Sequence, residues 1–150
     1  MSQHTEIGRR SFILATGAAA LSAATPNVIA AASHHNHGSK GMGLVKTSAH
    51  CTATGNTCVA HCYILLGEGD KEMAECAQSV HLMLAMCNAV GLHAAADSKY
   101  LKEIAATCKS VCEDCEKACK KHEDEHEECK ACAESCADMV AECKAYLKVA

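Results

Sequence analysis

Cysteine and aliphatic side chains recur every three or four residues along four stretches of the chain, with small or charged residues between them. In the stretch 44–66, the steps are 7, 4 and 3, at Cys51, Cys58, Cys62 and Leu65. In the stretch 71–90 the steps alternate between three and four, at Met73, Cys76, Val80, Met83, Cys87 and Val90. Residues at such steps share one face of a helix. The pattern therefore predicts two helices, over 44–66 and 71–90.

Two further helices are predicted over 95–121 and 124–148 from the same spacing. The inward positions of the first are Leu101, Ile104, Cys108, Cys112, Cys115 and Cys119. Those of the second are Cys129, Cys132, Cys136, Met139, Cys143 and Tyr146. A single long helix across both stretches is the alternative, because no Gly or Pro separates them. It is disfavoured, since the step of 10 from Cys119 to Cys129 fits whole helical turns worse than the other steps.

The connections between these helices predict how they lie against one another. Residues 67–70 form a turn signal in which Asp70 can cap the next helix, and Gly91 is expected to end the second helix. Short connections make neighbouring helices antiparallel. The sequence therefore predicts an all-α fold, an antiparallel up-down-up-down four-helix bundle with a cysteine-lined core, over residues 44–150.

A rise of about 1.5 Å per residue allows the cysteines, all expected to point inward, to be ordered by depth. The end at which the first helix begins is expected to hold Cys51, Cys87 and Cys143. The middle is expected to hold Cys58, Cys108 and Cys136, with Met83 close by. Deeper positions are expected for Cys62, Cys76, Cys112 and Cys132, and then for Cys115 and Cys129. Cys119 is expected at the far end, beside His122 and His126.

Composition shows how unusual this core would be. The 150 residues include 13 Cys, three Tyr, one Phe and no Trp. Between Ala105 and Cys143, the only large apolar residues besides cysteine are Val111, Met139 and Val140. Something must therefore compensate for the lost apolar burial. Scattered basic residues and few aromatic ones argue against nucleic-acid binding, and no apolar run reaches the ~20 residues that span a bilayer.

The N-terminal part of the chain has the features of an export signal. Arg9 and Arg10 form a twin-arginine pair, an apolar stretch follows to about Ala24, and residues 30–32 offer a small-residue cleavage site. We expect residues 1–32 to be a twin-arginine signal peptide, so that the protein is exported to the periplasm or another extracytoplasmic space. Residues 33–43 are expected to form a flexible tail that contains His and Met.

Three ordinary explanations of the cysteines fit the spacing poorly. Disulfides are disfavoured because the count is odd and because Cys at i and i+4 on one helix have poor geometry for a bridge. A four-cysteine zinc pattern is present as Cys112-x2-Cys115 and Cys129-x2-Cys132, but it leaves nine cysteines unexplained. Cys112-x2-Cys115-x3-Cys119 resembles part of an iron–sulfur run. A redox or electron-transfer protein with one Cys-ligated zinc or iron–sulfur cluster is the alternative function.

Several Cu(I) ions per chain fit the pattern better. Cu(I) is soft and prefers thiolate and thioether sulfur, and one monovalent ion per thiolate gives a neutral core. The candidate ligands are Cys51, Cys58, Cys62, Cys76, Cys87, Cys108, Cys112, Cys115, Cys119, Cys129, Cys132, Cys136 and Cys143. They repeat along helices instead of converging on one site with a nucleophile and a base. We therefore expect a binding and storage protein and not an enzyme.

With these inward cysteines over residues 44–148 and its twin-arginine leader, the chain resembles the exported members of the bacterial copper storage protein family. The resemblance implies storage of Cu(I), for later supply to copper enzymes or for copper detoxification. It also implies a homo-oligomer, expected to be a tetramer, and His and Met residues at one open end of the bundle, where metal is admitted.

Two ends of the bundle offer such residues. One end has Met42, His50, Met83 and Met86, and the other has His122 and His126, with His61 as a further candidate. We favour the first end because thioethers suit Cu(I). A second apolar stripe does not coincide with the sulfur face and is a candidate subunit interface. It consists of Val59, Tyr63, Leu66, Leu82, Met86 and Ala89.

Overall fold

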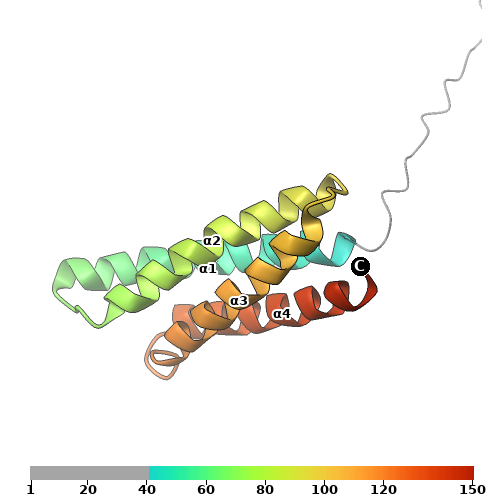
Figure 1. Ribbon diagram of the computed structural model, residues 1–150. Coiled ribbons are helices and arrows are strands. Elements are labelled where there is room, and N and C mark those ends of the chain that lie inside the picture. The colour runs from blue at the N-terminus through green and yellow to red at the C-terminus, as the bar shows by residue number, and fades with distance from the viewer. Residues whose placement is uncertain (1–40) are drawn as a thin grey trace, which may run out of the picture. The chain divides into compact units, whose positions relative to one another are not determined.

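The computed structural model describes residues 41–150. The expected signal peptide and most of the expected tail lie outside the described residues. The described part contains four helices, α1 (Met42–Glu68), α2 (Met73–Ala95), α3 (Leu101–Lys120) and α4 (Glu127–Val149), coloured from cyan to red in Figure 1. Helix α1 begins two residues earlier than expected and so includes the last residues assigned to the tail. No strand occurs between residues 41 and 150.

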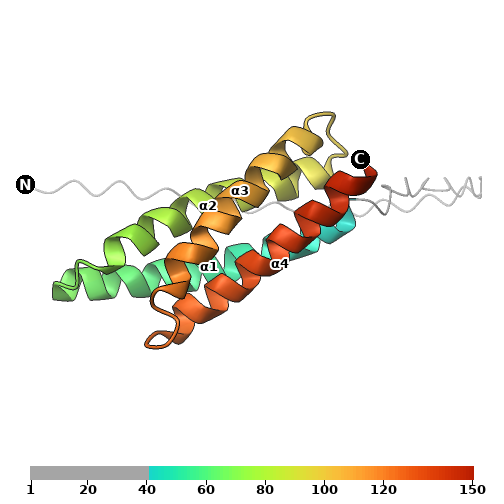
Figure 2. The ribbon, with the colours of Figure 1, turned by 60° about the horizontal axis from the view of Figure 1, so that its bottom comes forward.

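The four helices form an antiparallel bundle, as the two views in Figure 1 and Figure 2 show. Helix α1 packs against α2 and α4, and α3 packs against the same two helices. The predicted up-down-up-down arrangement is confirmed. The single long helix across 95–148 is excluded, because the chain turns back between Lys120 and Glu127. None of the helices in residues 41–150 is long and apolar enough to cross a membrane.

The turn between α1 and α2 follows its sequence signal. Gly69 ends α1 in the left-handed conformation at φ 100°, and its N–H bonds the carbonyl oxygens of Leu65 and Leu66. Glycine adopts this conformation without steric cost. Asp70 accepts a hydrogen bond from the N–H of Glu72 at 3.0 Å. It therefore stabilises the turn but does not cap α2, which begins at Met73 without a side-chain cap.

The expected end of the second helix at Gly91 is wrong. Helix α2 continues through Gly91 to Ala95. A Cβ at Gly91 would lie 2.6 Å from the Oγ of Ser48 on α1. This glycine therefore permits the close approach of two helices and does not end one of them. The turn that follows occupies residues 96–100, and α3 begins at Leu101 instead of about Ala95.

Gly55 has a similar role in the middle of α1. The sequence suggests a weak point there, because Gly costs about 1 kcal/mol in a helix relative to Ala. The helix is continuous, however, and Gly55 is buried. A Cβ at this position would lie 2.5 Å from Cε of Met83 and 3.0 Å from Cδ2 of Leu84. The missing side chain therefore lets α2 approach α1 at the level of Met83.

We expect Gly55→Ala to destabilise the metal-free protein by about 1 kcal/mol or more. Overpacking at a closed site costs roughly 1–3 kcal/mol, and this cost outweighs the gain of about 1 kcal/mol in helix propensity. Gly67→Ala in the same helix is the matched control, because a Cβ there meets nothing within 4 Å. It should stabilise the protein by up to about 1 kcal/mol. Anaerobic urea unfolding measures both, and equal effects of the two changes would contradict the prediction.

Candidate metal centre

Sulfur fills the centre of the bundle. All 13 cysteines have 0% exposed surface and none forms a disulfide. They come from all four helices, so the expectation that they point inward is confirmed. The leucine and valine side chains that are completely buried with them are few, namely Leu44, Val80 and Val90. The core is therefore held together by fewer large apolar contacts than is usual for a bundle of this size.

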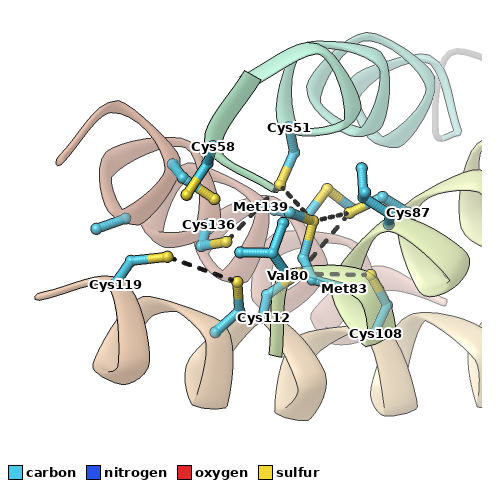
Figure 3. Packing of buried hydrophobic residues seen from close by; sticks show 14 of the residues in the cluster. Cys51, Cys58, Val80, Met83, Cys87, Cys108, Cys112, Cys119, Cys136 and Met139 are labelled. Atoms are coloured by element: carbon cyan, nitrogen blue, oxygen red, sulfur yellow. Dashed lines mark hydrogen bonds between the residues drawn. The ribbon is translucent and has the colours of Figure 1, made fainter. Parts of the chain in front are cut away.

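One half of the sulfur core lies toward the end at which α1 begins, and Figure 3 shows part of it. The Sγ atoms of Cys51, Cys87 and Cys112 lie within 4.8 Å of one another and come from α1, α2 and α3. Cys136 of α4 lies 3.9 Å from Cys51. Cys108 lies 3.9 Å from Cys112, four residues along the same helix. A metal ion in this half could therefore be bound by sulfur from several helices at once.

The other half lies toward the α1–α2 and α3–α4 turns. The Sγ atoms of Cys58, Cys62, Cys76 and Cys129 all lie within 4.8 Å of one another. Cys119 joins this group through Cys76, at 3.6 Å. Two further sets connect the halves, Cys58 with Cys119 and Cys132, and Cys115 with Cys132 and Cys136. Because the sets share members, the thiols form a continuous chain along the bundle.

The depth order predicted for α3 is wrong by about one helical turn, and that of α4 is shifted in the same direction, since Cys136 lies 3.9 Å from Cys51. Cys112 lies level with Cys51 and Cys87 instead of deeper. Cys119 lies beside Cys58 and Cys76 instead of at the far end. The reason is that α2 runs past Gly91 and residues 96–100 are used in the turn. Each residue of α3 is therefore closer to the start of α1 than the prediction placed it.

The residues considered for admitting metal do not gather at one place. Met83 has 0% exposed surface and Met86 packs against the core. Met42 is 45% exposed and His50 lies in a surface hollow with Lys46, Asp138 and Glu142. Met83 therefore belongs to the interior and is separate from the exposed side chains near the same end.

The two histidines at the opposite end are half-buried in or beside the α3–α4 turn. Nδ1 of His126 lies 3.1 Å from Nε2 of His61, and this Nε2 lies 3.7 Å from a carboxylate oxygen of Glu128. The structure thus brings together His61 and His126, which are 65 residues apart in the sequence. The depth of His61 along its helix predicted that it lies at this end, but not that it contacts His126.

Sequence reasoning missed a buried polar contact between α1 and α4. Ser135 has 0% exposed surface, and its Oγ lies 2.6 Å from Oγ1 of Thr54. The same hydroxyl donates to the carbonyl oxygen of Cys132 at 2.9 Å. Ser135 directly precedes Cys136, one of the inward cysteines of α4, and this position could have indicated that it is buried. In residues 41–150 no buried side-chain nitrogen or oxygen lacks a partner, so sulfur is the only unusual chemistry of the core.

Contacts between the thiols shift their pKa values in both directions. The hydrogen bond with Cys108 and desolvation by burial raise the pKa of Cys143 above its ordinary value of 9.0. Contacts with Cys108 and Cys112 raise the pKa of Cys87 in the same way. Hydrogen bonds with Cys108 and Cys136 lower the pKa of Cys112 to about 5. Metal binding at the thiols with raised pKa values, Cys87 and Cys143, would therefore displace protons, and it would be pH-dependent.

Known proteins with a similar sequence or fold are copper storage proteins. The chain matches the family model described as copper storage protein over residues 35–148. It has the fold of apo copper storage protein 3 from Bacillus subtilis, with 24% identity, 71% of this chain and 97% of that chain covered, and a TM-score of 0.62. The Cu(I)-bound copper storage protein BsCsp3 is 26% identical, with 72% and 98% covered and a TM-score of 0.65. No curated protein sequence matches the chain. Because the family match spans most of its length, the chain belongs to the copper storage protein family.

Proposed function

We propose that this protein stores many Cu(I) ions in the bundle core, with the 13 cysteine thiolates as ligands. The observation that carries the proposal is the continuous row of fully buried sulfur, in which neighbouring Sγ atoms lie 3.6–4.0 Å apart. Membership of the copper storage protein family and the fold shared with Cu(I)-bound BsCsp3 support it. Each Cu(I) that binds displaces thiol protons, so the loaded core carries little net charge.

The alternative, a single zinc or iron–sulfur cluster, has less support. The four cysteines of the zinc pattern do not converge, because Cys112 is grouped with Cys51 and Cys87, whereas Cys129 is grouped with Cys58, Cys62 and Cys76. The last group could surround one tetrahedral ion. It would leave nine other thiols buried, and a site of four thiolates and Zn²⁺ would carry a charge of about −2 in a low-dielectric core.

The stored copper is proposed to serve later supply to copper enzymes, copper detoxification, or both. Export through the twin-arginine pathway is proposed from the Arg9–Arg10 leader. Mass measurement of protein recovered from the periplasm should give a chain that begins near Ser33, and an uncleaved cytoplasmic chain would contradict export. The metal is proposed to enter at the end where Met42 and His50 are exposed.

A homo-oligomer, expected to be a tetramer, is proposed from the family resemblance. Two members of the second apolar stripe, Tyr63 and Leu82, are 49% and 59% exposed and could be covered by another subunit. Sedimentation velocity of the purified chain would contradict this proposal if it showed a monomer.

Titration of the reduced, metal-free protein with Cu(I) under anaerobic conditions tests the storage function. We expect uptake on the order of one Cu(I) per cysteine, measured by mass spectrometry and metal analysis. Cys112→Ser and Cys132→Ser should each lower the capacity only slightly, because the ligands are many. Saturation at one or two ions per chain would contradict storage, as would loss of all binding in either single variant. A colourless loaded protein would also argue against the redox alternative.

A further inference from the structure

One sulfur atom in the core is not a thiol. Helix α2 has no cysteine between Cys76 and Cys87, and Met83 occupies the inward position one turn before Cys87. Met83 is completely buried. Its Sδ accepts a hydrogen bond from the Sγ of Cys51 at 3.3 Å and another from the Sγ of Cys87 at 3.6 Å. These are the two contacts that meet at Met83 in Figure 3.

The three sulfur atoms of Cys51, Cys87 and Met83, which form two hydrogen bonds in the metal-free protein, are also placed so that they could bind one soft metal ion. The three sulfurs form a triangle, since Cys51 and Cys87 also lie within 4.8 Å of each other. With metal–sulfur bonds of about 2.3 Å, the length known for zinc thiolates, three sulfurs in a plane around one ion lie about 4 Å apart. An ion at the centre of this triangle would require shifts of less than about 1 Å in the sulfur positions. In both contacts the thiol is the donor, because a thioether sulfur carries no proton.

We propose that Met83 is an internal Cu(I) ligand, which forms a site of two thiolates and one thioether with Cys51 and Cys87. This inference rests on the proposed storage function. When the ion binds, each thiol releases its proton to solvent and no electron is transferred. The thioether has no proton to release and adds no charge. It therefore gives the ion a third ligand without the charge cost of a third thiolate in a buried core.

Met139 provides a comparison within the same core. It is as completely buried as Met83 and lies on the inward face of α4, between Cys136 and Cys143. Within residues 41–150, however, no thiol forms a hydrogen bond with its sulfur, whereas two do so at Met83. If methionine merely filled space in this core, the two positions would respond alike to metal.

The test is NMR of the protein labelled with methyl-¹³C methionine, recorded before and after anaerobic loading with Cu(I). Cu(I) has a closed d shell, so the signals stay sharp. The Met83 methyl signal, identified by its absence in Met83→Leu, should shift on loading by more than the Met139 signal. In competition with a Cu(I) chelator, Met83→Leu should lose about one equivalent of copper that the parent chain retains. Met139→Leu, which removes a thioether of the same size and burial, should retain copper as the parent chain does.

The outcomes separate this inference from the storage function. If the parent chain takes up many Cu(I) ions but the Met83 methyl signal does not move, the ligand role fails and storage stands. If Met139→Leu loses as much copper as Met83→Leu, the effect is one of packing and the ligand role again fails. If the parent chain takes up no Cu(I), both proposals fail. The loading experiment uses the unmodified sequence, and if Met83→Leu does not fold, the Met83 methyl signal is identified instead by nuclear Overhauser contacts with the neighbouring residues Cys51 and Cys87.

Discussion

Loading with Cu(I) is expected to raise the unfolding temperature of the protein by about 20 °C or more. Each ion that binds the folded chain better than the unfolded one adds about 2.7 kcal/mol at a hundredfold excess over its dissociation constant. The ions would also link the helices, since Cys51, Cys87 and Cys112 belong to α1, α2 and α3. The metal-free core has few large apolar side chains, so its stability without copper should be modest. Together these effects make metal the main stabilising component of the fold.

Circular dichroism during anaerobic heating measures this difference between the metal-free and loaded forms. Removal of copper from the loaded protein with a chelator should return the unfolding temperature to its original value, which controls for irreversible change. Unfolded chains with many thiols also bind Cu(I), and this reduces the effect. An unchanged unfolding temperature after full loading would mean that copper lies outside the buried core.

The bundle could be predicted from sequence because two independent features, residue spacing and residue type, identify the same inward positions. The recurrence of apolar residues at steps of three and four indicates helices, and cysteine marks the same face of each helix. A residue such as Cys132 is therefore placed correctly by the pattern on its own helix alone. The same argument explains why all 13 cysteines are buried as expected.

The register between helices could not be predicted in this way, because it depends on contacts between residues far apart in sequence. Gly91 is a stop signal when read locally, and only the presence of Ser48 on α1 shows that it serves close packing. The error at this glycine carried over to the depth of every cysteine on α3. Met83 was predicted on the inward face of its helix, where it does lie, but its contact with Cys51 on α1 depends on the register between helices and could not be predicted.

The pairing of His61 with His126 shows the same limit. His61 is next to the inward Cys62 on α1, and His126 directly precedes α4. Their contact, however, depends on how α1 lies against the start of α4. No periodicity within one helix contains that information. The pattern of a single chain therefore predicts which face of a helix is inward, and the structure is needed to show which residues meet there.

The metal-free protein is expected to lose stability steeply as the pH rises above about 9. Six thiols have raised pKa values in the folded protein, and three of them, Cys87, Cys136 and Cys143, are raised by hydrogen bonds with neighbouring thiols and by burial. Below the ordinary value of 9.0, these thiols keep their protons in both states and have no effect on stability. Above it, the unfolded chain releases protons that the folded chain retains, so the unfolded state is favoured. Each such thiol costs about 1.4 kcal/mol per pH unit, or about 4 kcal/mol for Cys87, Cys136 and Cys143 alone.

Cys112 does not offset this loss. Its pKa is lowered to about 5 in the folded protein by contacts with Cys108 and Cys136. A group with a lowered pKa adds stability as the pH rises from its folded to its unfolded value, and this contribution is complete above about 9. A loss of about 4 kcal/mol per pH unit is large compared with the 5–15 kcal/mol that typically stabilises a protein. The metal-free bundle should therefore unfold by about pH 11.

The loaded protein should respond to pH in the opposite direction. Its thiolates are already deprotonated by copper, so alkaline pH removes nothing from them, whereas acid returns protons that compete with Cu(I). Anaerobic urea unfolding between about pH 8 and 10.5, with a phosphine reductant present, measures the metal-free form, and the loaded form controls for titration of Tyr and Lys. Cys143→Ser should reduce the alkaline slope by about 1.4 kcal/mol per pH unit, because it removes one of the six thiols whose pKa values are raised. Parallel losses in the metal-free and loaded forms would show that surface groups, and not buried thiols, govern the alkaline response.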